Sequence, residues 1–176
     1  MWSTFIALLL SAGVVQAEVT DKAATGFTSV HQLTINATPT EVYAALTERI
    51  SHWWDAAHSY SGAAANFSMD ARAGGCFCEQ LPGGGSVEHM RVVFADTGRM
   101  LRLKGGLGPL QSMGVAGAMS FTLSEADGGT RLDYRYVVGG HHEGGLDTLA
   151  EPVDRVQLGQ LQRLKRYLET GNPELP

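Results

Sequence analysis

The sequence predicts a single α+β domain in which an antiparallel sheet packs against a long C-terminal helix. Three observations support this prediction. Residues 27–36 alternate between apolar and polar side chains, residues 65–138 form a run of short apolar segments separated by glycine-rich turns, and residues 150–170 place apolar side chains on one arc of a helical wheel. Strands joined by such short turns pair antiparallel. The helix is therefore expected to bury its apolar arc on one face of the sheet.

The composition agrees with one folded domain and excludes several classes of protein. Of 176 residues, 44% are hydrophobic and 18% are charged, which is enough apolar surface to oppose the conformational entropy of the chain. The 22 glycines follow no fixed period, so a collagen-like structure is excluded. The net charge is −5 and no segment concentrates Lys or Arg. Because a protein that grips a phosphate backbone needs a basic face, we expect no nucleic-acid partner.

The first 17 residues are typical of a signal peptide. They carry no charged side chain, residues 5–15 are predominantly apolar, and Val15 and Ala17 place small residues at positions −3 and −1 of a cleavage site. The alternatives are a disordered start and an uncleaved membrane anchor, and an anchor needs about 20 apolar residues. We therefore expect cleavage after Ala17 and a secreted or periplasmic protein with no stable membrane anchor. Residues 18–26 would be an N-terminal extension to a domain of residues 27–170, and residues 171–176 a C-terminal tail.

Two helices have recognisable boundaries in the sequence. Thr38 and Glu41 form a capping box around a proline that suits the first helical turn, and an apolar stripe follows at 42, 46 and 50. The last helix has Pro152 in its first turn and ends before Gly171, a residue suited to a helix stop. Its apolar arc contains Val153, Val156, Leu161, Leu164 and Leu168.

Counting through two of the turns predicts which residues face each other across the sheet. The turns are taken at residues 97–98 and at residues 126–129, and both registers agree with the apolar pattern. The predicted pairs are Val92–Leu103, Phe94–Leu101, Phe121–Tyr134 and Met119–Tyr136, and the opposite, solvated face carries Arg131, Asp133 and Arg135.

The turn at residues 82–85 admits two registers. A four-residue loop places Glu79 opposite Glu88, where like charges repel each other. A three-residue loop pairs Glu79 with His89 instead, and it agrees with the register of the next hairpin. We therefore prefer the second register, which turns Glu88, Cys76 and Cys78 toward the inner face.

The inner face in these registers is a mostly apolar wall with a few polar groups, which is typical of a small-molecule site. A buried Glu88 with a raised pKa near His31 could act as a general acid or base; alternatively, Glu88 lies solvated at a strand end or paired with an Arg. Of the adjacent tryptophans 53 and 54, one fits the core and the other the cavity entrance. The candidate ligand-binding residues are His31, Trp54, Cys78, Glu88, Met90, Met113, Met119, Phe121, Tyr134 and Tyr136.

Three further features give weaker signals. Cys76 and Cys78 would have Cα atoms about 6.5–7 Å apart on an extended strand, at the limit of disulfide geometry, so we interpret them as small buried residues, with a redox or metal role as the alternative. The apolar, glycine-rich residues 105–117 form either a lid over a cavity or a loop packed on the sheet edge. The histidines at 52, 58, 141 and 142 lack the spacing of metal ligands. We therefore expect no metal and no cofactor, and we assign no catalytic residue.

The order of these elements resembles that of the START-like superfamily, also called SRPBCC, and in particular its polyketide cyclase/dehydrase-like and chaperone-ATPase-activator-homology branches. The resemblance covers residues 27–170 and is carried by residues 35–43 (INATPTEVY), the Trp53–Trp54 pair, Gly74–Gly75 and residues 160–168 (QLQRLKRYL). It implies the helix-grip fold, in which a curved antiparallel sheet wraps around the C-terminal helix and leaves a cavity for apolar or amphipathic ligands. It does not imply one reaction, because a fold hosts many functions.

We therefore expect an exported protein that holds a small apolar or amphipathic molecule between sheet and helix. Two alternatives stay open: a cyclase- or hydrolase-like acid/base enzyme that uses the same cavity, and a protein-interaction module without a functional pocket. The sequence contains no nucleophile elbow and no dinucleotide fingerprint, which favours binding over catalysis. It leaves the oligomeric state open.

Overall fold

The computed structural model describes residues 16–174. Its strands are β1 (Gln16–Ala23), β2 (Gly26–Ile35), β3 (Phe67–Met69), β4 (Cys76–Gln80), β5 (Ser86–Asp96), β6 (Met100–Lys104), β7 (Gly114–Ala126) and β8 (Gly129–His141). Its α-helices are α1 (Pro39–Thr47), α2 (Ile50–Trp53) and α3 (Asp147–Thr170), and its short 3-10 helices are η1 (Ala56–His58), η2 (Ala64–Asn66) and η3 (Gly108–Ser112).

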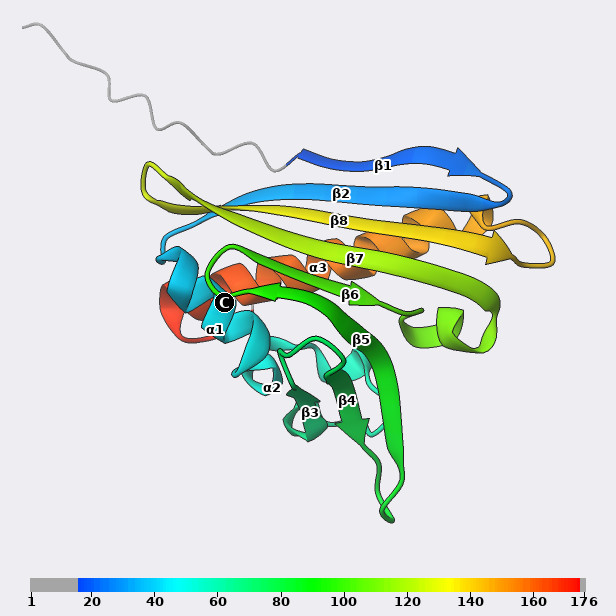
Figure 1. Ribbon diagram of the computed structural model, residues 1–176, viewed down its shortest axis with the longest axis horizontal. Coiled ribbons are helices and arrows are strands. Elements are labelled where there is room, and N and C mark those ends of the chain that lie inside the picture. The colour runs from blue at the N-terminus through cyan, green and yellow to red at the C-terminus, as the bar shows by residue number, and fades with distance from the viewer. Residues whose placement is uncertain (1–15, 175–176) are drawn as a thin grey trace, which may run out of the picture.

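The strands form one antiparallel sheet in the order β1-β2-β8-β7-β6-β5-β4-β3. The sheet curves, β5 bends between the half that pairs with β4 and the half that pairs with β6, and α3 runs along the inner face, with α1 and α2 packed near its C-terminal end (Figure 1). The core lies between these two layers and includes Ile35, Leu103, Leu132 and Leu164, each at most 1% exposed. The predicted α+β fold, a curved antiparallel sheet around a long C-terminal helix, is confirmed.

Strand β1 is an element that the apolar pattern did not predict. Residues 16–23 pair antiparallel with β2, so that Ala17 lies opposite His31 and Ala23 opposite Gly26. This pairing uses backbone groups, so it needs no alternation of apolar side chains. Most of the predicted signal peptide, residues 1–15, lies outside the described residues, and the predicted cleavage site falls within β1.

The capping box at the start of α1 is confirmed. The Thr38 hydroxyl accepts a hydrogen bond from the Glu41 backbone N–H at 3.3 Å, and Glu41 Oε2 accepts one from the Thr38 backbone N–H at 2.8 Å. The predicted apolar stripe is buried at Val42, Leu46 and Ile50. Because α1 ends at Thr47, the last of these residues begins the separate helix α2.

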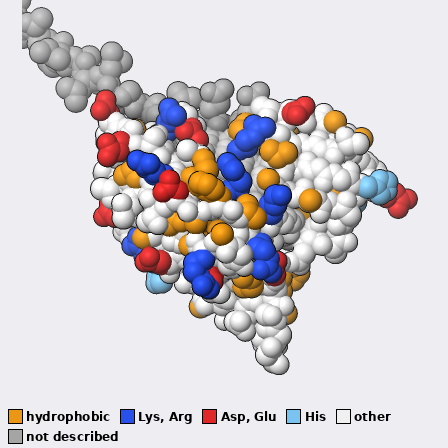
Figure 2. Space-filling model, viewed as in Figure 1, with side chains coloured by type: hydrophobic (Ala, Val, Ile, Leu, Met, Phe, Trp, Pro, Cys, Tyr) orange, Lys and Arg blue, Asp and Glu red, His pale blue; other side chains and the backbone are white. Residues whose placement is uncertain are grey.

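The register of β7 and β8 is the predicted one, with Phe121 opposite Tyr134 and Met119 opposite Tyr136. On the outer face of the sheet, Lys and Arg side chains gather beside apolar ones (Figure 2). Arg131 and Arg135 are exposed there, and Arg131 pairs with the half-buried Asp133 at 2.9 Å, as expected of a solvated face.

The register of β5 and β6 is confirmed in one pair and wrong in the other. Val92 lies opposite Leu103 as predicted, but Phe94 lies opposite Arg102, is 45% exposed, and does not face Leu101. A bulge at residue 93 adds one residue to β5, and the turn spans residues 97–99. The three-residue turn shifts the pairs next to it by one residue. The bulge places two residues of β5 against one of β6, which restores the predicted register at Val92.

The preferred register of β4 and β5 is also wrong. Cys78 lies opposite Glu88 and Phe77 opposite Met90, so His89 is an extra residue in β5. Because of this bulge, both His89 and Met90 point inward and are at most 4% exposed, whereas Glu88 points outward.

Helix α3 begins three residues earlier than predicted, which places Pro152 beyond the first turn. Gly171 has φ 78° and ends the helix, as expected for a residue in the left-handed region. Its most buried face contains Gln157 and Gln160 among the apolar side chains, whereas Val153 and Val156 are half-buried. Within residues 16–174, no helix is both long and apolar enough to cross a membrane.

Candidate functional site

A cavity of about 480 Å³ opens between α3, the segment after α2 and the connection from β6 to β7. Its walls are mainly apolar and come from four segments that are far apart in the sequence. The lining residues are Trp54, Ala57, His58, Ser59, Tyr60, His89, Leu107, Gly108, Pro109, Leu110, Leu149, Pro152, Val153, Val156 and Gln157.

The connection from β6 to β7 forms one wall of this cavity. Leu107 and Leu110 are 7% and 1% exposed, and both line the cavity while packing in the core. Tyr136 holds the connection in place: its hydroxyl donates to the Gly105 carbonyl at 3.1 Å and accepts from the Leu107 N–H at 3.3 Å. Of the two interpretations of residues 105–117, the structure supports an apolar segment that covers a cavity.

A buried histidine–carboxylate pair forms the polar part of the cavity. Nε2 of His89 lies 2.9 Å from Oε2 of Glu79, and both side chains are almost fully buried. Glu79 also accepts the backbone N–H groups of Tyr60 at 3.1 Å and of Ser61 at 2.5 Å. It therefore ties the segment after α2 to the sheet.

The surroundings of this pair lower the pKa of both Glu79 and His89. Burial alone would raise the pKa of Glu79, but the hydrogen bonds from Ser61, Tyr60 and His89 outweigh it and lower that pKa. Burial lowers the pKa of His89 below its usual range, although the Glu79 carboxylate opposes the shift. The imidazole is then neutral at neutral pH and can donate through Nε2 while Nδ1 acts as an acceptor.

Gln157 brings a second polar group to the cavity. Its Oε1 accepts a hydrogen bond from the Tyr134 hydroxyl at 2.9 Å, and both side chains are at most 5% exposed. Burial raises the pKa of Tyr134 well above its usual range and that of Tyr136 to about 12, so both phenols stay protonated. The Tyr134 hydroxyl is therefore engaged within the fold.

His31 belongs to a different cluster, between β2 and α3. Its Nε2 lies 2.9 Å from Oδ1 of Asp154, and the Ser29 hydroxyl donates to the same oxygen at 2.5 Å. Nδ1 of His31 is buried without a hydrogen-bond partner within the described residues. His31 does not line the cavity, and it faces α3, whereas Glu88 lies on the outer face of the sheet, so the structure does not bring the two together.

The remaining predicted site residues fall into three groups. Trp54 lines the cavity, and its indole N–H donates to the His58 carbonyl at 3.0 Å. Met90, Met119, Phe121, Tyr134 and Tyr136 are buried in the core, and Met113 packs against it half-buried. None of these six residues lines the cavity.

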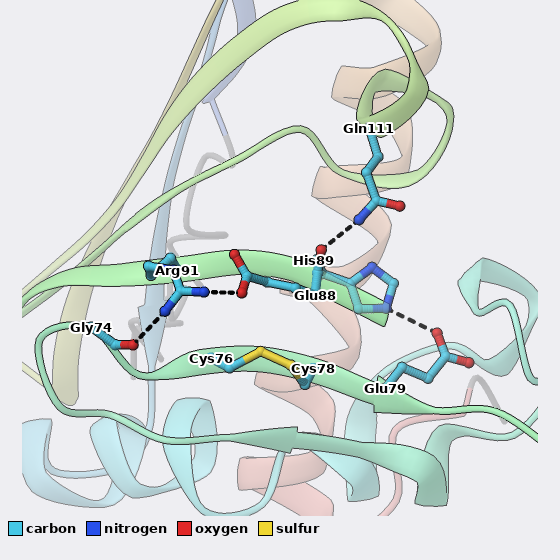
Figure 3. The surroundings of a disulfide bond; sticks show 8 residues. All are labelled: Gly74, Cys76, Cys78, Glu79, Glu88, His89, Arg91 and Gln111. Carbon is cyan, nitrogen blue, oxygen red and sulfur yellow. Dashed lines mark hydrogen bonds and ion pairs between the residues drawn. A yellow bond between two sulfur atoms is a disulfide. The ribbon is translucent and has the colours of Figure 1, made fainter. Parts of the chain in front are cut away.

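Glu88 and Cys78 lie outside the inner face, contrary to the prediction. Glu88 is exposed on the outer face and pairs with Arg91 (Figure 3). Cys78 forms a disulfide with Cys76, and their Cα atoms are 5.4 Å apart, closer than on an extended strand. The bulge at His89 is the reason for the change of face, because one extra residue reverses the side-chain alternation of β5.

Sequence reasoning missed the cavity role of His89 and Gln157. The sequence did contain one signal for His89. Its charge complements that of Glu79, and this led us to predict their contact correctly, but on the outer face of the sheet instead of the inner one. Gln157 interrupts an apolar arc of α3, which gives no such signal.

Within residues 16–174, no three His, Cys, Asp or Glu side chains are placed to hold a metal ion.

Two other hollows in the described part of the chain lack this combination of groups. The larger, about 730 Å³, lies between α1 and residues 67–73, where the charged lining residues Glu48 and Arg72 are exposed. Another, about 520 Å³, lies on the outer face of the sheet, where Arg102, Asp133 and Arg135 line it. The apolar cavity beside α3 is therefore the candidate site.

Solved structures share this architecture, whereas no family model and no curated protein matches the chain. CalU16 from Micromonospora echinospora matches with a TM-score of 0.61 at 17% identity, over 91% of this chain and 86% of that one. The chain has the helix-grip fold. A conserved protein of unknown function from Enterococcus faecalis matches with a TM-score of 0.60 at 14% identity, over 92% and 82%. DynU16, a protein in the dynemicin biosynthetic locus, matches with a TM-score of 0.57 at 20% identity, over 83% of this chain and 48% of that one.

Proposed function

We propose that the protein is a member of the START-like superfamily that binds a small apolar or amphipathic molecule in the cavity beside α3. The observation that carries this proposal is the cavity itself, about 480 Å³ with mainly apolar walls and the buried His89 among its lining residues. Sites of this size and make-up suit small molecules, because apolar walls supply affinity and a few polar groups fix orientation.

The positions of the polar groups indicate how such a ligand would be oriented. Its apolar part would contact Leu107, Leu110 and Val156, and its polar end would reach His89, whose Nδ1 makes no hydrogen bond within the described residues. Nε2 is already engaged by Glu79, so the ring is held in one orientation before binding. A preorganised polar group loses less entropy on binding than a mobile one.

Binding of 8-anilinonaphthalene-1-sulfonate, followed by its fluorescence, tests this proposal. Val156→Phe places a larger side chain in the cavity and should weaken binding about tenfold or more, which corresponds to about 1.4 kcal/mol. Val137→Phe makes the same change on the outer face of β8, where Val137 is 38% exposed, and should leave binding unchanged. Equal affinities in the two variants would overturn the proposal. If Val156→Phe weakens binding as expected, native mass spectrometry of protein from its own host is the measurement that identifies a copurifying ligand.

We also propose that the protein is exported and cleaved after Ala17. The Cys76–Cys78 disulfide supports export, because disulfides persist mainly in oxidising compartments. Cleavage there would leave residues 18–23 of β1, which keep their pairing with β2. Intact-mass measurement of the native protein should find Glu18 at the N-terminus. An uncleaved chain in the soluble cytosolic fraction would contradict export.

The second candidate function is acid/base catalysis in the same cavity. His89 favours it, because a neutral imidazole oriented by a buried carboxylate is the usual arrangement of a general base. Hydrolysis of 4-nitrophenyl butyrate provides a first test. A loss of about 100-fold in His89→Gln would support catalysis by His89, and unchanged rates would remove His89 as the base for this reaction.

A further inference from the structure

The Cys76–Cys78 disulfide lies on the outer face of β4, on the opposite side of the strand from the cavity (Figure 3). Phe77, between the two cysteines, points inward and is 3% exposed, with its ring 5.2 Å from that of His89. The cysteines themselves are half-buried, so solvent reaches this part of the strand.

The position of this disulfide is unsuited to a structural staple. A disulfide stabilises a fold mainly by closing a loop in the unfolded chain, and the effect grows with the length of that loop. Here the loop contains one residue, and both cysteines belong to a strand that already pairs with β3 and β5. The bond therefore links parts of the chain that the sheet holds together without it.

The neighbouring strand places charged side chains beside the two sulfurs. Arg91 lies opposite Cys76 and Glu88 opposite Cys78, and residues that face each other across a sheet share one side of it. Arg91 donates to the Gly74 carbonyl at 2.8 Å and pairs with Glu88, which holds its guanidinium on this face. The Arg91 cation opposite Cys76 favours a thiolate at Cys76, whereas the Glu88 carboxylate opposite Cys78 disfavours one there. A thiolate is both the nucleophile and the better leaving group in disulfide exchange.

We propose that Cys76–Cys78 is a redox-active disulfide that exchanges with the dithiol of a partner protein. A partner thiolate attacks one cysteine sulfur, the Cys76–Cys78 bond breaks, and the other sulfur leaves as a thiolate that takes up a proton. The other thiolate of the partner protein then attacks the partner sulfur of the mixed disulfide. The cysteine of this chain that was held in the mixed disulfide leaves as a thiolate and takes up a proton. The partner loses two electrons and two protons and becomes a disulfide, while Cys76 and Cys78 become thiols; the reverse reaction restores the bond.

Equilibration of the folded protein in glutathione buffers tests this proposal. Without denaturant, iodoacetamide trapping and mass spectrometry should detect both the dithiol and the disulfide across buffers of differing reduced-to-oxidised ratio. A structural disulfide would stay oxidised in all of them. Alkylation that appears only after unfolding in guanidinium would overturn the proposal.

Two sets of variants separate redox activity from a structural role. Cys76→Ser/Cys78→Ser should remain folded, with a melting temperature within about 5 °C of the native protein; unfolding of this variant, or of the reduced protein, would show that the bond is a staple. Arg91→Gln should slow alkylation of the reduced protein several-fold, whereas Arg99→Gln, at an exposed arginine beyond the end of β5, should not. Equal rates in both arginine variants would remove the assigned role of Arg91.

Discussion

His89 and Glu79 approach to 2.9 Å on the inner face of the sheet, from two strands that one hairpin joins. Glu79 is fully buried and accepts hydrogen bonds from the ring of His89 and from the backbone of Tyr60 and Ser61. One carboxylate thus positions both His89 and the segment after α2, and both line the cavity.

Replacing Glu79 by Gln should destabilise the protein by about 2–3 kcal/mol, because the amide nitrogen must face a backbone or ring donor and leaves a buried donor unsatisfied. Urea unfolding measures this loss. Glu88→Gln, the same change on the outer face of the neighbouring strand, should cost less than about 1 kcal/mol, since Glu88 is exposed. Similar losses in the two variants would show that the Glu79 hydrogen bonds add little to stability.

Stability should fall as the pH drops from about 7 toward 5. Burial lowers the pKa of both His31 and His89, so the unfolded chain binds protons more strongly than the folded one below about pH 6.5. The two neutral histidines therefore contribute their full share of the free energy of unfolding above that pH, and this share is lost as the pH falls toward their pKa values in the folded protein.

Each histidine should add a slope of up to about 1.4 kcal/mol per pH unit to the free energy of unfolding. Urea unfolding at a series of pH values measures this slope, which His31→Gln and His89→Gln should each reduce whatever their absolute stability. His58→Gln alters an exposed histidine of the cavity rim and is the control. If neither His31→Gln nor His89→Gln changes the slope, the pH dependence does not come from these two histidines.

Removing the Tyr134 hydroxyl should lower stability by about 0.5–1.5 kcal/mol, because Oε1 of Gln157 would lose its donor in a buried site. Thermal unfolding of Tyr134→Phe is the measurement. Tyr60→Phe removes a hydroxyl that donates to the Gly108 carbonyl at the surface, where Tyr60 is 54% exposed, and should change stability by less than about 0.5 kcal/mol. A Tyr134→Phe protein as stable as the native one would mean that this buried hydrogen bond contributes nothing net.

Loss of the Thr38 side chain should cost about 1 kcal/mol, because it removes the side-chain cap of α1. Chemical denaturation of Thr38→Ala should detect this difference. Thr40→Ala, two residues further into the helix, removes no cap and should be neutral or slightly stabilising, since alanine favours helix more than threonine does. The prediction fails if the two variants lose the same stability.

The elements that the sequence predicted well depend on contacts between near neighbours. The capping box joins Thr38 to Glu41, and the stop at Gly171 needs only one left-handed residue. The register of β7 and β8 follows from a tight turn and an unbroken alternation, so Phe121 could be matched to Tyr134 by counting. In each case the sequence separation is short or the pattern is uninterrupted, and the local preference and the fold agree.

The candidate site was decided by contacts that the local pattern does not contain. One extra residue at His89 turned Glu88 outward and brought His89 to the cavity, and alternation of period two has no means of indicating such an insertion.

The polar positions of α3 depend on even more distant partners. Gln157 is buried because Tyr134 donates to it, and Gln160 because it accepts the backbone N–H of Asp55. The sequence by itself determined the long helix and the strands from β2 to β8, since those follow from backbone preference and apolar periodicity. Only the tertiary structure decided which polar groups could be buried, because a buried polar group is stable only where a distant residue completes its hydrogen bond.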